Sequence, residues 1–307
     1  MDITLALGGG GVRGIAHIGV LRTLEEHHFK IKAIAGTSAG GLVGAVYAAG
    51  FSTQKIEDAI NDFSPLRSFS RHAQDSPSLL GLGGISEILE GLLSDITFDE
   101  LKIPFAATAV SLYSGKEIIL NKGKVLDAIL ATAAVPGVFP SQNIGGRVLV
   151  DGGILDPVPV QVARWLRPDL PVIAVTLHKR PSDFPEEEVP LPIYIPGPTP
   201  IVEHLTNLKS VQAFKIFSQS MEVASQHLTE LSMQVYKPEV IISPPVGHIG
   251  LLQKIEVSEL IDDGMLATEE VLSEIEAEAN WMKILQRKLK HSVNPDPLPD
   301  HWGNIKR

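Results

Sequence analysis

The pentapeptide at residues 36–40, Gly-Thr-Ser-Ala-Gly, fits the G-x-S-x-G pattern of a nucleophile elbow. An apolar stretch at 31–35 precedes it, and a run of small residues at 41–50 follows it. This order predicts a strand, a sharp turn and a helix, with the Ser38 hydroxyl at the edge of a sheet near a helix N-terminus. The pattern therefore predicts a serine nucleophile for acyl transfer. In an ordinary loop, the same serine would only cap a helix.

A second glycine-rich turn, residues 9–14 (Gly-Gly-Gly-Val-Arg-Gly), separates an apolar strand pattern from a helical pattern. It satisfies the dinucleotide-binding fingerprint G-x-G-x-x-G. That fold needs an acidic residue where the second strand ends, and here the serine pentapeptide stands in that place. A Walker P-loop needs a Gly-Lys-Ser/Thr sequence, which does not follow. We therefore favour an oxyanion hole, in which consecutive backbone N–H groups of Gly9, Gly10 and Gly11 face a developing negative charge.

Arg13 is the only charged residue of this turn. Two roles are open to it. Its guanidinium can hold the loop through hydrogen bonds to carbonyl groups, or it can bind an anionic head group.

The base that would activate Ser38 is not obvious among the histidines. A Ser–His–Asp triad needs a histidine after the elbow, and His178 and His248 are the best placed, although neither has a distinctive setting. Asp151 follows an apolar run at 148–150 and precedes two glycines. An aspartate at the carboxyl end of a buried strand lies where α/β active sites form, and burial raises its pKa. Because Asp-Gly is also a common turn pair, both interpretations of Asp151 remain open.

Alternating strand and helix patterns predict a central, mostly parallel sheet with helices on both faces, an α/β class of fold. We expect strands at 3–7, 31–35, 105–110, 116–120, 148–150, 172–176 and 240–243, and helices at 12–27, 41–50, 53–63, 125–134, 208–231 and 257–284. Residues 64–95 are rich in Ser, Gly and Pro around a short helical pattern at 85–93, and form either a surface insertion or a mobile cap. Residues 184–200 are predicted to be loop and 292–307 a tail.

Composition narrows the function classes. The 307 residues include no cysteine, which excludes disulfides and cysteine-based metal or redox chemistry. The net charge of −10 disfavours nucleic acid and gives no general attraction to anionic lipid, so any membrane contact should be apolar, local and transient. We find neither a signal-peptide pattern nor an apolar run of the ~20 residues that span a bilayer. We expect a cytoplasmic protein that is at most peripheral at the membrane.

Together these segments resemble the patatin-like phospholipase family, most closely its compact bacterial branch, which is similar to the esterase domain of neuropathy target esterase. The glycine turn, the elbow and Asp151-Gly152-Gly153 match the three family motifs in order. Residues 131–140 and 247–250 also fit, and the likeness runs from about residue 3 to 272.

The resemblance implies a three-layer α/β/α catalytic domain over residues 1–272, followed by a C-terminal helix and polar tail at 273–307. It implies a Ser–Asp dyad without a catalytic histidine, in which Ser38 is the nucleophile and Asp151 the general base. The oxyanion loop would comprise Gly9, Gly10 and Gly11 with Arg13 nearby, and the supporting glycines would be Gly36, Gly40, Gly152 and Gly153.

The implied substrate is a lysophospholipid or other fatty-acyl ester, cleaved through an acyl-enzyme without metal or cofactor. The alternative is a lipid-binding or regulatory protein of the same fold with weak catalysis. One residue departs from the pattern, because Asp156 stands where many members have Asn. A second carboxylate close to Asp151 would raise the pKa of one of the two.

Overall fold

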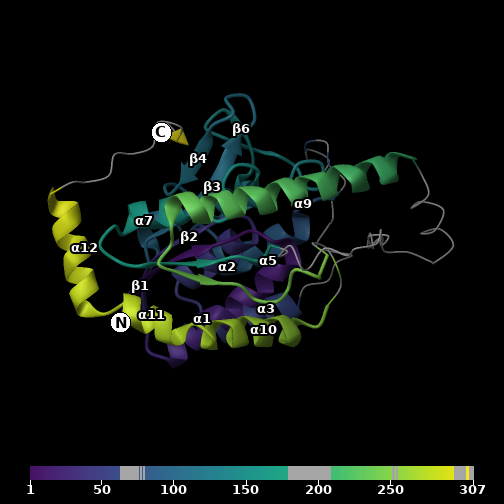
Figure 1. Cartoon of the computed structure of the whole chain (residues 1–307). Helices are drawn as coiled ribbons and strands as arrows, with labels where there is room; N and C mark the ends of the chain where they lie inside the picture. Colours follow the sequence, from purple (N-terminus) through teal and green to yellow (C-terminus); the bar gives the residue numbers. More distant parts are fainter. Residues whose placement is uncertain are drawn as a thin grey trace.

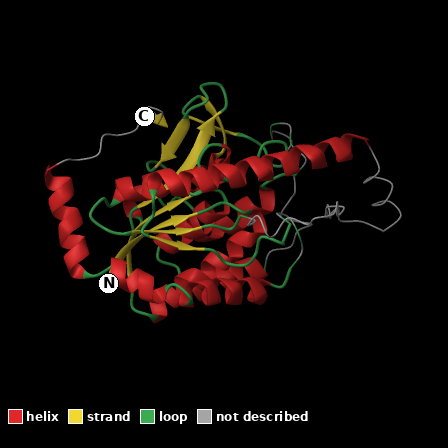
Figure 2. Ribbon diagram, viewed as in Figure 1, coloured by secondary structure: helices red, strands yellow, loops and turns green. Residues whose placement is uncertain are grey.

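A mostly parallel sheet with helices on both faces forms the centre of the molecule (Figures 1 and 2). The computed structural model describes residues 1–62, 76, 78, 80–178, 209–250, 253, 255–293 and 302–303. In these residues the sheet has nine strands, seven of them in the order β5-β6-β3-β2-β1-β7-β8, while β4 pairs with β3 and with β9. The strands are β1 (Asp2–Leu7), β2 (Lys30–Gly36), β3 (Phe105–Ser111), β4 (Glu117–Leu120), β5 (Gln142–Ile144), β6 (Arg147–Asp151), β7 (Val172–Val175), β8 (Val240–Ile242) and β9 (Trp302–Gly303). The predicted fold class is confirmed.

Helices cover the two faces unequally. In Figure 1, α7 and α9 cross one face of the sheet, and α1, α2, α3 and α10 cover the other. The helices are α1 (Ala16–Glu26), α2 (Ala39–Ala48), α3 (Thr53–Asn61), α5 (Gly83–Leu93), α6 (Val125–Thr132), α7 (Val160–Leu166), α9 (Lys209–Tyr236), α10 (Val257–Glu269), α11 (Leu272–Glu278) and α12 (Trp281–Val293), with short 3₁₀ turns η1 (Gly11–Ile15), η2 (Phe98–Glu100) and η3 (Gly152–Ile154).

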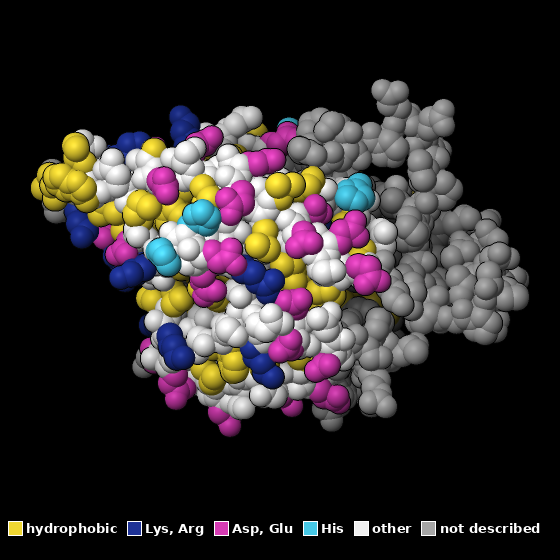
Figure 3. Space-filling model, turned by 90° about the horizontal axis from the view of Figure 1, so that it is seen from below, with side chains coloured by type: hydrophobic (Ala, Val, Ile, Leu, Met, Phe, Trp, Pro, Cys, Tyr) yellow, Lys and Arg dark blue, Asp and Glu magenta, His cyan; other side chains and the backbone are white. Residues whose placement is uncertain are grey.

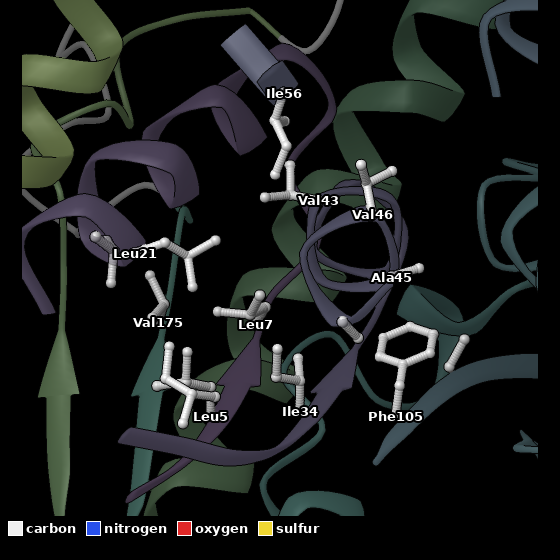
Figure 4. Packing of buried hydrophobic residues seen from close by; sticks show 14 of the residues in the cluster. Leu5, Leu7, Leu21, Ile34, Val43, Ala45, Val46, Ile56, Phe105 and Val175 are labelled. Carbon is white, nitrogen blue, oxygen red and sulfur yellow. The ribbon is translucent and has the colours of Figure 1, made fainter. Parts of the chain in front are cut away.

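The larger core lies between the sheet and the α1–α2 layer. Because side chains alternate along a strand, Leu5 and Leu7 of β1 enter this core while Ala6 joins a smaller cluster under α7 and α9. Figure 4 shows Leu7 and Ile34 on the strands facing the α2 side chains Val43 and Val46. The strands that carry the predicted motifs are therefore held from both sides.

The other end of the sheet is antiparallel. β1, β2, β3, β7 and β8 run parallel, whereas β6 runs antiparallel to β3, and β5 antiparallel to β6. Ala107 and Ala109 of β3 both have β4 on one edge. Their other neighbours, on the opposite edge, are Gly36 of β2 and Asp151 of β6. The carboxyl ends of β2 and β6 thus meet against one edge of β3.

Some predicted elements differ in detail. The helical pattern at 257–284 forms three helices, α10, α11 and the start of α12. The predicted tail contains β9, which pairs with β4. Within 64–95, the described helix α5 contributes Leu89 and Leu93 to the larger core. The predicted loop at 184–200 and most of residues 64–79 lie outside the described residues.

Candidate active site

The elbow and Asp151 come together because their strands end on the same edge of β3. β2 runs parallel to β3 and reaches Ala107 with Gly36, and antiparallel β6 arrives from the opposite direction and reaches Ala109 with Asp151. Two strands that approach head to head bring the residues after their last positions into one small volume. Ser38, two residues beyond Gly36, lies within hydrogen-bond reach of the Asp151 side chain.

Ser38 occupies a strained backbone conformation at the start of α2. Its φ of 52° and ψ of −120° are unfavourable for a residue with a side chain, and such outliers gather at functional sites. Its N–H donates to Thr132 Oγ1 at 2.9 Å, which helps to hold the turn. The Ser38 side chain makes no capping hydrogen bond to α2. The interpretation of Ser38 as an ordinary helix cap is therefore excluded, and its hydroxyl is available to Asp151.

The glycine after the elbow allows α2 to start directly against β1. A Cβ on Gly40 would lie 2.2 Å from the backbone oxygen of Leu7. The turn is closed by a hydrogen bond from the Gly40 N–H to the Thr37 carbonyl at 2.9 Å. A larger residue at position 40 would push the helix, and Ser38 with it, away from the sheet.

Asp151 is buried, and burial raises its pKa to about 6. Hydrogen bonds from the Ser38 hydroxyl and from the Gly153 N–H, the latter at 2.7 Å to Oδ1, stabilise the carboxylate and oppose this shift. A carboxylate that titrates near pH 6 can accept a proton at neutral pH and return it later. The environment of Asp151 therefore suits a general base.

Two buried threonines join the elbow to the turn after Asp151. Thr37 Oγ1 donates to the backbone oxygen of Asp156 at 2.9 Å, so it accepts from Thr108 Oγ1, 2.7 Å away. A Cβ on Gly152 would lie 2.1 Å from Thr108 Oγ1, so only glycine fits beside this hydroxyl. The pair fixes the elbow relative to the aspartate turn.

Sequence patterns gave no sign of these threonines or of Thr132. Each is a single buried polar residue in or beside an apolar segment, and its partner is distant in the chain. A buried threonine inside a strongly apolar strand such as β3 is the one available signal, since a buried hydroxyl needs a partner.

The glycine turn lies beside Ser38. A Cβ on Gly9 would lie 3.2 Å from the Ser38 Cβ. The Gly9 N–H, however, donates to the Pro157 carbonyl at 2.9 Å. The N–H groups of Gly10 and Gly11 make no hydrogen bond to another described residue. Of the three predicted donors, the N–H groups of Gly10 and Gly11 are therefore available to an oxyanion. Gly9 lacks a side chain, which allows the turn to pass close to Ser38.

Arg13 is fully buried and has protein partners for its guanidinium. Nε donates to the Ile249 carbonyl at 2.6 Å, and Nη1 to the Leu177 carbonyl at 3.4 Å. Nη2 forms an ion pair with Glu222 Oε1 of α9 at 2.5 Å. Of the two roles left open by the sequence, this geometry matches the clamp that holds the loop.

Neither candidate histidine contacts the dyad. His178 is bonded through Nε2 to Ser225 Oγ at 2.8 Å and through Nδ1 to Thr229 Oγ1 at 3.3 Å, both on α9. Burial and then the charge of Arg13 lower the pKa of His178 to about 4. His248 is exposed, and its Nδ1 lies 3.1 Å from the Pro245 carbonyl. Among the described residues, no histidine is bonded to Ser38 or Asp151.

Asp156, the departure from the family pattern, is paired with a second buried carboxyl group. Burial, the charge of Glu117 and a hydrogen bond with Glu117 raise the pKa of Asp156 well above its usual range. One proton shared by the pair removes the repulsion between two buried negative charges. A protonated Asp156 is neutral and can donate a hydrogen bond, as an asparagine would.

All three motifs lie within the part of the chain that matches a family model, residues 5–164, described as patatin-like phospholipase. The chain belongs to the patatin-like phospholipase family. The resemblance inferred from the sequence is thereby confirmed.

Relatives of this patatin-like protein carry the NTE family name. It is 38% identical over 181 residues to an uncharacterized NTE family protein of Mycobacterium tuberculosis, which covers 57% of this chain and 49% of the relative. A second such protein of that organism is 27% identical over 281 residues, covering 88% of this chain and 46% of the relative. Lysophospholipase NTE1 of Eremothecium gossypii is 31% identical over 164 residues, 52% of this chain and 11% of that protein. The chain thus spans about half the length of its mycobacterial relatives and a small part of the fungal one.

Among solved structures, VipD from Legionella pneumophila is similar, with a TM-score of 0.49 and 13% identity over 90% of this chain and 67% of that one. Within the described residues, no helix combines the length and apolar character needed to cross a membrane.

Proposed function

We propose that the chain hydrolyses fatty-acyl esters of lipids through a Ser38–Asp151 dyad and an acyl-enzyme intermediate. The observation that carries the proposal is the pairing of a strained elbow serine with a buried aspartate, whose pKa is raised to about 6 and which accepts the serine hydrogen bond. Hydrolysis of an ester needs a nucleophile, a base and donors for the oxyanion. Each has a candidate at the junction of β2 and β6 and at the glycine turn beside it.

The first half-reaction forms the acyl-enzyme. Ser38 Oγ attacks the ester carbonyl carbon while Asp151 takes the hydroxyl proton. The N–H groups of Gly10 and Gly11 stabilise the oxyanion of the tetrahedral intermediate. When the intermediate collapses, the carbon–oxygen bond to the alcohol breaks, and the alcohol leaves with the proton from Asp151.

The second half-reaction releases the fatty acid. Asp151 takes a proton from water, and the hydroxide attacks the acyl carbon through the same oxyanion site. Ser38 Oγ leaves and recovers the proton from Asp151. One ester and one water give one alcohol and one carboxylic acid, and no metal or cofactor takes part.

The substrate class is a lysophospholipid or another fatty-acyl ester. The family description and the lysophospholipase name of one relative support it. Contact with the membrane surface that holds such lipids is part of the same proposal, since an insoluble ester must be reached where it lies.

Turnover of dissolved p-nitrophenyl butyrate and of lysophosphatidylcholine tests the dyad. We expect Ser38→Ala and Asp151→Asn each to lower kcat/KM by at least about 1000-fold, because residues that act as a unit are each required. Ser86→Ala, at a half-buried site on α5, and Asp99→Asn, at an exposed site on η2, are the matched controls and should leave turnover unchanged. Wild-type turnover in Ser38→Ala would overturn the proposal. Loss of turnover in folded His178→Gln or His248→Gln would favour a triad instead.

The pH profile tests Asp151 as the base. Because the base must be ionised, kcat/KM should fall as the pH drops through about 6, the pKa to which burial raises Asp151, and should level off above it. The measurement is kcat/KM for the dissolved ester from pH 4.5 to 9. If kcat/KM falls only near pH 4 instead, the essential base is a carboxyl group with an unperturbed pKa.

A further inference from the structure

Helix α12 (Trp281–Val293) presents large apolar side chains to solvent along one side. Trp281, Leu285 and Leu289 follow at intervals of four, and Met282 lies next to Trp281, so all four share one side of the helix. Trp281 is 71% exposed and Leu289 60%. Seen from below, hydrophobic side chains gather at the end of the molecule where α12 lies in Figure 1, with Lys and Arg side chains beside them (Figure 3).

The charge of α12 is opposite to that of the chain. The helix has four Lys or Arg residues and no acidic residue, although the whole chain has a net charge of −10. Two of the basic residues, Lys283 and Arg287, bind Glu278 at 2.5 and 2.6 Å. Lys288 and Lys290 are exposed, and Lys288 approaches Asp169 only to 4.0 Å. Basic groups thus remain at the surface beside the apolar side.

Ion pairs attach α12 to one end of the sheet. Arg287 lies 3.7 Å from Glu239, the residue before β8, and Lys288 approaches Asp169, which shortly precedes β7. These partners mark the amino-terminal ends of parallel strands, whereas Ser38 follows a carboxyl-terminal end. The apolar side of α12 is therefore not part of the catalytic junction.

Exposed apolar side chains of the helices α9 and α10 lie on elements without an excess of basic residues, because α9 carries two Lys and two Glu and α10 carries no Lys or Arg. Leu266 on α10 is also exposed, but the same helix carries Asp262, Asp263 and Glu269. An anionic surface would repel that helix and attract α12. A basic helix with a Trp and aliphatic residues on the opposite side is the pattern of helices that lie in the membrane interface.

We propose that α12 docks this protein on anionic lipid bilayers. The helix lies in the plane of the interface, with Trp281, Met282 and Leu285 at the boundary between headgroups and acyl chains. Lys288 and Lys290 lie among the lipid phosphates. Docking through α12 holds the protein at the surface that contains its proposed substrate and leaves the catalytic edge of the sheet uncovered. The choice of a bilayer over an acidic protein rests on the proposed function.

Co-sedimentation with vesicles of phosphatidylcholine, with and without phosphatidylglycerol as an added anionic lipid, tests the proposal. Ser38→Ala protein is used so that the lipid stays intact. We expect binding to the anionic vesicles only. Trp281→Ser with Leu285→Ser should lower the partition coefficient by at least about tenfold, from the loss of two apolar side chains. Leu266→Ser with Val235→Ser, at exposed sites on α10 and α9, is the matched control and should bind as before.

A second pair of variants separates charge from apolar contact. Lys288→Glu with Lys290→Glu should abolish the preference for phosphatidylglycerol. Lys116→Glu with Lys122→Glu, which changes the net charge equally at exposed sites near β4, should keep it. Circular dichroism confirms that each variant is folded. Added salt should weaken binding of the unaltered helix, because exposed charges are screened.

Two outcomes would overturn the docking surface. One is that the α12 variants bind the anionic vesicles as well as their control variants do. The other is that the protein does not bind the vesicles, and the apolar side of α12 instead mediates self-association or binding of an acidic protein in a way that requires Trp281. Failure of the proposed chemistry looks different. If the proposed chemistry is wrong, the Ser38→Ala variant will hydrolyse dissolved esters as fast as the unaltered protein does. If only docking is wrong, Ser38→Ala will be inactive on dissolved esters, and every α12 variant will still hydrolyse them.

Discussion

At the scale of single residues, Asp151 lowers the stability of the fold that contains it. Its pKa is raised from 3.8 to about 6 by burial, so the folded state binds the proton more tightly than the unfolded state does. The contribution of Asp151 to the free energy of unfolding is fully present below pH 4, and it is lost as the pH rises through the folded-state pKa of about 6. The loss above that pH is on the order of 3 kcal/mol.

Asp151→Asn should therefore stabilise the protein while it abolishes turnover. We expect the free energy of unfolding to rise by up to about 3 kcal/mol at pH 8 and to be unchanged at pH 4, because the amide has no charge to bury. Urea unfolding at the two pH values gives the comparison. An equal gain at both pH values would trace the effect to something other than ionisation.

Thr132 holds the backbone of Ser38, the proposed nucleophile, through one hydrogen bond. Thr132→Val keeps the shape but removes the acceptor for the Ser38 N–H. The unpaired N–H costs about 1–3 kcal/mol, which we expect as a fall in kcat of about 10- to 100-fold with little change in KM. Thr132→Ser restores the acceptor and should restore kcat. If serine rescues no better than valine, the threonine serves packing alone.

At the scale of elements, small residues allow backbones to approach at the junction. α2 starts against β1 because Gly40 has no side chain, and the Asp151 turn passes Thr108 because Gly152 has none. The sequence predicts these glycines from their motif. It does not reveal which backbone or hydroxyl each one meets, because those groups come from strands distant in the chain.

Two glycine substitutions in helices should have opposite effects. Gly40→Ala would place a methyl group 2.2 Å from the Leu7 oxygen, and we expect a loss of more than about 2 kcal/mol in stability, or no folding. Gly91→Ala in α5 meets nothing within 4 Å and should stabilise the protein by about 0.5–1 kcal/mol through helix propensity. Thermal unfolding of both variants tests the contrast. Similar melting temperatures for the two would contradict the packing described for α2.

At the scale of the whole molecule, Arg13 joins four segments that are far apart in sequence. Arg13 itself belongs to the glycine turn, and its guanidinium binds Leu177, two residues after β7, the loop at Ile249 and helix α9. A buried guanidinium with several planar donors has no equivalent in lysine, which carries one compact charge. The geometry of the glycine turn, the proposed oxyanion loop, thus depends on the packing of α9 on the sheet.

Arg13→Lys should be far more damaging than the same change at Arg22. Arg13 is fully buried, so lost bonds leave Glu222 and two carbonyl groups without this partner. We expect a loss of at least about 2 kcal/mol in stability. Arg22 pairs with Glu57 in a partly exposed site, where the loss should be within about 1 kcal/mol. Equal effects in denaturant unfolding would contradict the clamp.

The sequence by itself determined which residues could do the chemistry. Ser38, Asp151 and the glycine turn each lie in a short local pattern of strand, turn and helix, and such patterns depend on neighbours in the chain. The same local information predicted the α/β class and most strands. It also made a histidine base doubtful, since no histidine had a distinctive setting.

Only the tertiary structure decided how those residues meet. The antiparallel direction of β6 brings Asp151 to Ser38, and it depends on pairing with β3, far away in sequence. Thr132, the Thr37–Thr108 pair and the Gly9–Pro157 hydrogen bond are likewise contacts between distant segments. The burial that raises the pKa of Asp151 and the exposure of the apolar side of α12 arise from the packing of the whole chain. Local patterns specify candidates, and long-range packing specifies their geometry, burial and partners.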